Sequence, residues 1–141
     1  YILTYILGDE IKGGHAKAIN SIKTRYNLNK VISIIIPNSA SKIVCLSDEA
    51  YYDLSPERWV SMIANASVVY TDSFHAILFS LKFKKRFFAY CSNKIRSSRL
   101  NNLKKTYQLN QIVGSAEEIS SCNLSMSSIE YSENFLLELL R

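Results

Sequence analysis

The sequence predicts a single α/β domain of three layers with a mainly parallel sheet. Short apolar segments rich in β-branched residues alternate with segments of helical periodicity along most of the chain. This is the order that a parallel sheet with crossover helices requires. The apolar segment 67–70 leads directly into Thr71, Asp72 and Ser73 and then into a helical pattern, as at the carboxyl end of a buried strand in an open sheet.

The composition agrees with one domain that has a core of its own. The chain has 141 residues, of which 48% are hydrophobic, and no apolar run is long enough to cross a bilayer. Three widely spaced cysteines, Cys45, Cys91 and Cys122, favour reduced, buried thiols in a cytoplasmic protein over a disulfide framework. Because the chain opens within a strand-like segment and not on Met, we expect a fragment of a longer protein.

In the first half, residues 2–7 form a predicted buried strand that ends at Gly8. After Gly13 and Gly14, apolar residues at helical spacing predict a helix over 15–26. A β-branched run predicts a strand over 31–36, ended by Pro37, and a weaker one over 43–46, followed by a polar loop over 47–53.

In the second half, Ser55, Pro56 and Glu57 predict a helix start, since Ser caps free N–H groups, Pro fits the first turn and Glu complements the helix dipole. The elements predicted after it are a strand over 67–70, a helix over 74–83, a strand over 86–90, a helix over 98–107, a short helix over 116–120 and a terminal helix over 132–141.

The charges are unevenly distributed. Between Ser73 and Ala116 there is no acidic residue, so this part of the chain favours an anionic partner. The same segment holds nine cations: Lys82, Lys84, Lys85, Arg86, Lys94, Arg96, Arg99, Lys104 and Lys105.

His75 is the candidate for proton transfer. It is expected about one turn into a helix capped by Asp72 or Ser73, where free N–H groups favour an anion and the dipole favours a neutral imidazole. The alternative is a histidine packed under the sheet edge and bonded to a carbonyl.

Lys94, Arg96 and Arg99 follow the next strand, so their loop can face the same edge of the sheet and bind phosphate or carboxylate. The alternative is a solvated basic loop. By contrast, Lys82, Lys84, Lys85 and Arg86 are expected at the opposite edge, mainly as charges at a helix C-terminus.

Several classes of site lack their sequence signature. The glycines make neither a dinucleotide nor a P-loop motif, and His15 and His75 belong to no recognisable set of metal ligands. We therefore predict no metal. Aromatic residues do not interleave the cations as base-stacking platforms would, so nucleic acid is not the expected partner.

Two stretches carry a resemblance to a known family: Ser-Pro-Glu-Arg-Trp at 55–59, and Ala-Asn-Ala-Ser-Val-Val-Tyr-Thr-Asp-Ser-Phe-His at 64–75. Together they resemble the polysaccharide pyruvyl transferase family, with weaker similarity from Tyr1 to about Val113. The resemblance implies a Rossmann-like domain similar to the C-terminal half of a glycosyltransferase-B-type fold, with the N-terminal domain of the same protein missing.

The resemblance also implies an activity: transfer of the enolpyruvyl unit of phosphoenolpyruvate to a sugar as a pyruvate ketal, with release of phosphate, during assembly of a cell-surface polysaccharide. No cofactor is expected. His75 matches the motif histidine, a general acid or base, and Lys94 is the nearest match to an expected basic residue, with Arg96 or Arg99 as alternatives. The remaining expected substrate contacts are Gly8, Thr71, Asp72, Ser73 and Phe74.

Two other functions stay open. A nucleotide-sugar glycosyltransferase could share this fold, although no acid follows Asp72 until Glu117 to bind a ribose. A non-catalytic module for polyanions would explain the basic segment by charge alone, with binding that depends on salt and not on His75.

Overall fold

The computed structural model describes residues 1–36, 42–93 and 97–124. Within them the chain forms one six-stranded, wholly parallel sheet with four α-helices and two short 3₁₀ helices. The elements in chain order are β1 (Ile2–Tyr5), α1 (His15–Tyr26), β2 (Val31–Ile35), η1 (Lys42–Leu46), β3 (Glu49–Tyr52), α2 (Pro56–Asn65), β4 (Val68–Thr71), α3 (Phe74–Lys82), β5 (Arg86–Tyr90), α4 (Ser97–Tyr107), β6 (Ile112–Val113) and η2 (Ala116–Ser120).

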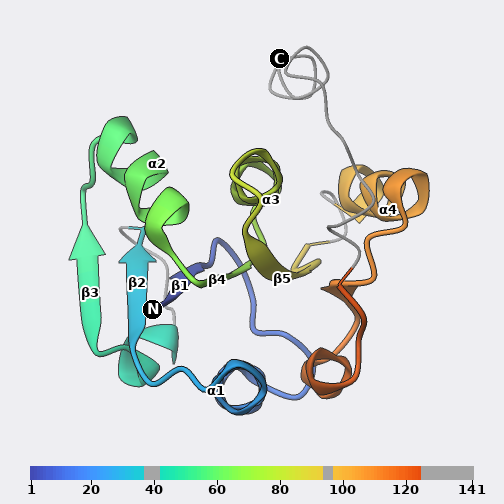
Figure 1. Cartoon of the computed structure of the whole chain (residues 1–141), viewed down its shortest axis with the longest axis horizontal. Helices are drawn as coiled ribbons and strands as arrows, with labels where there is room; N and C mark the ends of the chain where they lie inside the picture. The colour runs from blue at the N-terminus through green and yellow to red at the C-terminus, as the bar shows by residue number, and fades with distance from the viewer. Residues whose placement is uncertain (37–41, 94–96, 125–141) are drawn as a thin grey trace.

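The strand order is β3-β2-β1-β4-β5-β6, the order of a Rossmann-type sheet. In Figure 1, α2, α3 and α4 cover one face, and α1 with η2 covers the other. The predicted three-layer α/β class is therefore confirmed. Because the order reverses between β1 and β4, the carboxyl ends of these two strands form the topological switch point where such sheets bind ligands.

Each face of the sheet has its own apolar core. Leu3, Val69 and Phe87 point to the side of α2, α3 and α4, whereas Ile2, Val68 and Phe88 point to the side of α1 and η2. The alternation follows from the two-residue period of a strand. Because both faces are covered, these strands read as continuous apolar runs.

Most predicted elements are confirmed within a residue or two, and two predictions are wrong. Residues 42–46 form η1 and not a strand: Ile43 is buried, but its neighbour Val44 is 37% exposed, and the Ser47 hydroxyl donates to the Ile43 carbonyl, which closes a turn. The third strand is β3, within the predicted polar loop, and its pairing with β2 begins beyond Asp48, whose carboxylate accepts from the Val31 N–H. The predicted helix over 132–141 lies outside the described residues.

The helix starts follow the sequence closely. Ser55 caps α2 by accepting from the Arg58 N–H, and Pro56 occupies the first turn. Ser73, one of the two predicted caps of α3, accepts from the Ala76 N–H. Consequently His75 is the second residue of α3 and lies at the rim of the sheet, not one turn inside the helix.

Candidate functional site at the carboxyl edge of the sheet

The candidate site lies at the switch point between β1 and β4. A pocket of about 280 Å³ opens there, lined by Leu7, Asp72, Ser73, Phe74, His75, Arg99 and Leu100. These residues come from the segments that follow β1 and β4 and from the first turns of α3 and α4. Parallel strands thus bring residues far apart in sequence to one edge.

Asp72 holds the two strand ends together. Its carboxylate accepts hydrogen bonds from the Leu7 N–H at 2.7 Å and the Gly8 N–H at 2.9 Å, and from the Ser92 hydroxyl. The residue is only 2% exposed. A buried carboxylate needs such donors to offset its lost hydration, so Asp72 joins the segments after β1, β4 and β5 into one rim.

Gly8, predicted to contact the substrate, occupies the tightest part of this rim. A Cβ added at Gly8 would lie 2.6 Å from the Ser92 Oγ and 3.4 Å from the Asp72 Oδ2. Any larger residue would push Ser92 away from the carboxylate. The structure therefore gives Gly8 a packing reason to be glycine, beside any contact with a ligand.

Thr71 and Ser73 shape the turn into α3. The fully buried Thr71 hydroxyl donates to the Tyr5 carbonyl and accepts from the Ser73 N–H at 3.0 Å. The Ser73 hydroxyl accepts from Ala76, so both hydroxyls have partners inside the protein. Their predicted contact with substrate stays a prediction, since hydroxyls with these bonds keep only part of their capacity for a ligand.

His75 is exposed at the pocket, with its ring edge-on to Phe74 at a centroid distance of 6.1 Å. In the part of the chain that the structure describes, neither its side chain nor the backbone N–H groups of Phe74 and His75 have a hydrogen-bond partner. The first turn of α3 therefore presents two free N–H donors beside an accessible imidazole. Such a turn favours an anionic ligand.

Arg99 brings a cation into the same pocket. Its guanidinium carbon lies 4.0 Å from the centroid of the Phe74 ring, a distance typical of a cation–π contact. The aromatic ring steadies the exposed arginine beside His75. Of the three cations predicted in the loop after β5, Arg99 lies in the first turn of α4 and lines the same pocket as His75, while Lys94 and Arg96 lie outside the described residues.

The other basic cluster lies elsewhere, as predicted. Lys82 ends α3, and Arg86 begins β5, so both occupy the amino edge of the sheet, opposite the pocket.

A buried polar network that the sequence did not predict lies at the same edge of the sheet, on the face covered by α1. His15 is 2% exposed, and its Nδ1 shares a hydrogen bond of 2.6 Å with the Tyr70 hydroxyl. Tyr70 stacks on Tyr90, whose hydroxyl donates to the Asp9 carbonyl. Burial lowers the pKa of His15 and raises the pKa of Tyr70 and Tyr90. The network joins the segment after β1 to β4 and β5.

Other sequence expectations have mixed outcomes. The three cysteines are free thiols, but the prediction that they are buried is wrong: Cys45 and Cys91 are exposed and Cys122 is partly so. Among the described residues, no group of three or more His, Cys, Asp or Glu side chains could hold a metal ion. The same residues contain no helix with the length and apolarity to cross a membrane.

Together, the Rossmann-type strand order and a switch-point pocket with a histidine and an arginine define a Rossmann-like α/β domain with a candidate ligand site at its switch point. Comparison with family models then matches residues 9–94 to the polysaccharide pyruvyl transferase family. The chain belongs to this family, which is a family of transferases and implies a sugar or polysaccharide acceptor. The match includes Asp72 and His75 and ends before Arg99. Comparisons with curated proteins and with solved structures give no significant match.

Proposed function

We propose that this chain binds phosphoenolpyruvate in the switch-point pocket and supplies the residues that assist transfer of its enolpyruvyl unit to a pair of hydroxyls on a sugar of a cell-surface polysaccharide. The observation that carries the proposal is the pocket that His75 and Arg99 line together at the carboxyl edge of the sheet. Family membership supports the reaction class, and the Arg99 guanidinium at the pocket suits an anionic donor.

The proposed chemistry balances without a cofactor. The methylene carbon of phosphoenolpyruvate takes up a proton, and a sugar hydroxyl then attacks the cationic C2 and loses its own proton. The C–O bond to phosphate breaks, and a second hydroxyl attacks the same carbon to close the ketal. The proton of that hydroxyl leaves with the phosphate, so one donor and one diol give one ketal and one hydrogen phosphate.

In this proposal His75 supplies the first proton and accepts the one from the attacking hydroxyl. An acid or base must first be accessible to the substrate, and the His75 ring is exposed at the pocket. The Arg99 guanidinium and the free N–H groups of Phe74 and His75 would hold the donor's carboxylate and phosphate. Lys94 and Arg96 remain candidates for the same task.

We further propose that the chain is the C-terminal, donor-binding half of a two-domain enzyme, as the family resemblance implies. The acceptor would then enter between this pocket and the N-terminal domain, since ligand sites commonly form at domain interfaces. On this view the 141-residue chain binds phosphoenolpyruvate weakly and does not catalyse transfer alone.

Donor binding tests the proposal on the chain itself. Phosphoenolpyruvate should raise the melting temperature and broaden its own ³¹P signal, and Arg99→Gln should weaken binding about tenfold or more, as loss of a charge-assisted pair does. Arg58→Gln is the matched control, because Arg58 also lies over an aromatic ring, that of Tyr51, but on α2.

Two results would favour the other functions. A larger thermal shift with a nucleotide sugar than with phosphoenolpyruvate would indicate a glycosyltransferase, although the one carboxylate of the pocket, Asp72, already has three donors. Equal binding of every polyanion, lost with salt and unchanged in Arg99→Gln, would indicate a non-catalytic module.

A further inference from the structure

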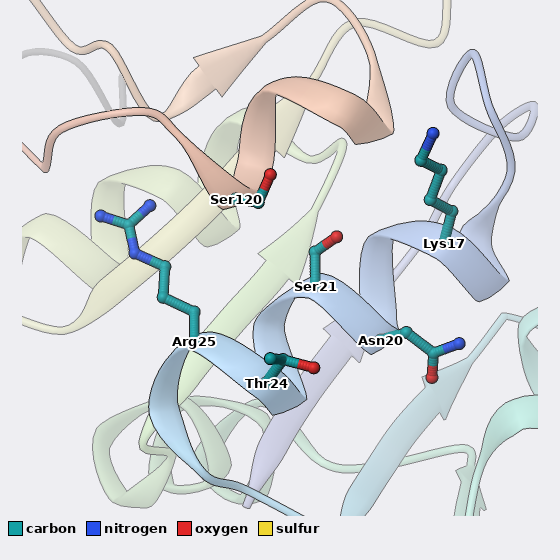
Figure 2. Close-up of a pocket in the computed structure, with 6 residues that line it drawn as sticks. All are labelled: Lys17, Asn20, Ser21, Thr24, Arg25 and Ser120. Atoms are coloured by element: carbon teal, nitrogen blue, oxygen red, sulfur yellow. The ribbon is translucent and has the colours of Figure 1, made fainter.

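A second hollow of the surface lies on the opposite face of the sheet from the proposed donor pocket. It is a groove of about 620 Å³ between α1 and η2, lined by Lys17, Asn20, Ser21, Thr24, Arg25 and Ser120. Figure 2 shows Lys17 and Arg25 at its two ends, with hydroxyl and amide groups between them. The chemistry proposed above makes no use of this groove.

The middle of the groove is lined by polar side chains that are available to bind a ligand. Within the described residues, the side chains of Asn20, Ser21 and Thr24 have no hydrogen-bond partner. They follow one another along one side of α1, and from Lys17 to Thr24 the helix rises roughly 10 Å. Hydroxyl and amide groups in such a row can donate to and accept from a polyhydroxylated ligand.

The ends of the groove are fixed in place by the protein. The Lys17 ammonium pairs with Glu117 at 2.9 Å, so its charge is compensated. Arg25 donates from Nη1 to the Ile119 carbonyl at 2.9 Å, and its guanidinium lies over the rings of Tyr26 and Phe88 at 5.5 Å and 5.7 Å. A held guanidinium loses less freedom when it binds a ligand than a mobile one does.

The Arg25 end of the groove carries excess positive charge. Arg86 lies over the same Tyr26 ring at 5.0 Å, so two guanidinium groups flank one aromatic side chain. Neither has a carboxylate partner among the described residues. The nearby Glu118 is turned to the Gly114 N–H at 3.2 Å. The guanidinium N–H groups of Arg25 and Arg86 could therefore donate hydrogen bonds to a carboxylate on a ligand at this end.

We propose that this groove binds an acidic glycan, with sugar hydroxyls along Asn20, Ser21 and Thr24 and a carboxylate at Arg25 and Arg86. The inference rests on the proposed function, because pyruvate ketals are the carboxylates that the reaction would add. The groove would then hold a repeat of the polymer that already carries a ketal while a later repeat reaches the donor pocket. The substrate of the enzyme would then be a growing polysaccharide that is already partly modified.

Other polyanions fit the groove less well. Proteins bind single-stranded nucleic acids largely by stacking the bases on aromatic rings, and none of the described residues that line the groove is aromatic. A purely electrostatic surface would not need the uncharged row that occupies its middle. The combination of several neutral hydrogen-bonding groups with one charged end matches a polymer that is mostly hydroxyl and carries an occasional carboxylate.

The test measures binding of the 141-residue chain to a polysaccharide that bears pyruvate ketals, and to the same polysaccharide after mild acid has removed them. Affinity electrophoresis at physiological salt suits a weak polymer ligand. Removal of the ketals should lower retention about fivefold or more, and Arg25→Gln and Arg86→Gln should each do the same to retention on the intact polymer. Arg58→Gln, the cation over Tyr51 on the other face, should leave it unchanged.

Arg25 also supports packing, so a second variant guards against misfolding. Thr24 is exposed, and its side chain has no hydrogen-bond partner among the described residues, so Thr24→Glu would add a carboxylate to the groove next to Arg25 without removing a hydrogen bond. It should abolish preference for the ketal-bearing polymer while the melting temperature stays within a degree or two. Equal retention of both polymers by the wild type, wild-type retention by Thr24→Glu, or equally strong retention on heparin and DNA would each overturn the proposal.

The outcomes also separate this inference from the proposed function. If phosphoenolpyruvate fails to bind while the ketal-bearing polymer is held through Arg25, the donor assignment fails alone. If donor binding depends on Arg99 but the groove variants leave retention unchanged, the groove assignment fails alone.

Discussion

The two histidines of this chain occupy equivalent places and have opposite environments. Each stands in the first turn of a helix that follows a strand of the switch point: His15 begins α1 after β1, and His75 is second in α3 after β4. His15 is buried and bonded to the Tyr70 hydroxyl, whereas His75 is exposed in a pocket beside Arg99. A histidine in the first turn of a helix is thus part of the packed interior on one face of the sheet and is accessible to a ligand on the other.

The difference arises in the segment that joins each strand to its helix. After β1 this segment holds Gly13 and Gly14 at positive φ, which turn the chain so that His15 packs under the rim, while Glu10 accepts from its N–H at 2.8 Å. After β4 the chain enters α3 within two residues, capped by Ser73, and the His75 side chain is exposed between the half-buried Phe74 and the buried Ala76. The long segment before α1 buries His15 in the first turn of that helix, whereas the short segment before α3 leaves His75 in the first turn exposed.

The sharpest test of this comparison is removal of the exposed ring. In the two-domain enzyme proposed above, His75→Ala should lower the rate of transfer from phosphoenolpyruvate by roughly 10²–10⁴, the usual contribution of a general acid or base. Phosphate release with a panel of sugar acceptors measures it. Because the ring is exposed, the melting temperature should stay near that of the wild type. Full activity would remove His75 from the mechanism.

The next largest effect is expected at Asp72, which joins the segments after β1, β4 and β5. Asp72→Asn replaces an acceptor of three hydrogen bonds with an amide that must turn a donor toward at least one of them. We expect a loss of about 2–3 kcal/mol in the free energy of unfolding, from the cost of an unsatisfied buried polar group. Urea unfolding measures this loss.

Asp53→Asn is the control for Asp72→Asn. Asp53 is exposed at positive φ, a conformation that Asn adopts equally well, so it should change stability by less than about 0.5 kcal/mol. An Asp72→Asn protein as stable as this control would show that the rim does not depend on the carboxylate.

A smaller effect is expected from crowding the same rim. Gly8→Ala places a Cβ 2.6 Å from the Ser92 Oγ, and overpacking of this kind costs about 1–3 kcal/mol. Because the clash involves one side chain, Ser92→Gly in the same protein should recover part of the loss. A double-mutant cycle measures the coupling, and additive effects would mean that Gly8 and Ser92 do not meet.

The parts of the fold that local sequence determines were predictable. The bounds of α1 and β5 match the residues expected from helical spacing and from an apolar run, and Ser55 with Pro56 begins α2. The edges of the sheet were not predictable. β3 is half-exposed and polar at its start, and β6 has two residues, so neither buries enough apolar surface to show a strand pattern.

The site was predictable to the same extent. An apolar strand followed by Thr71, Asp72 and Ser73 indicates a strand end at a rim, and the topology brings the loop after β5 beside it, which places Arg99 at the pocket. The partners of Asp72 could not be found in this way, since Ser92 and Gly8 meet it only through the strand order β1-β4-β5. His15 gave no signal, because burial of a first-turn residue depends on the loop that precedes it.

The smallest expected effect is a pH dependence of stability that comes from the buried His15. Burial lowers the pKa of His15 below its ordinary value, a shift that the attraction of Glu10 and Asp72 opposes and that Lys42 reinforces. Below about pH 6.5 the unfolded chain therefore binds a proton that the folded chain does not, and the linkage makes stability fall as pH falls, by at most about 1.4 kcal/mol per pH unit. The contribution is complete above the unfolded pKa.

His15→Gln should flatten this dependence between pH 7 and 5.5, measured by urea unfolding at each pH, because Gln can bond to Tyr70 but does not titrate. Tyr70→Phe separates the two causes: it removes the hydroxyl that meets Nδ1 but leaves the ring buried. It should lower stability by about 1 kcal/mol at neutral pH and keep the wild-type slope. If Tyr70→Phe flattened the slope and His15→Gln did not, the proton would belong to another group of the rim, and the contrast between a structural and an exposed histidine would lose its physical basis.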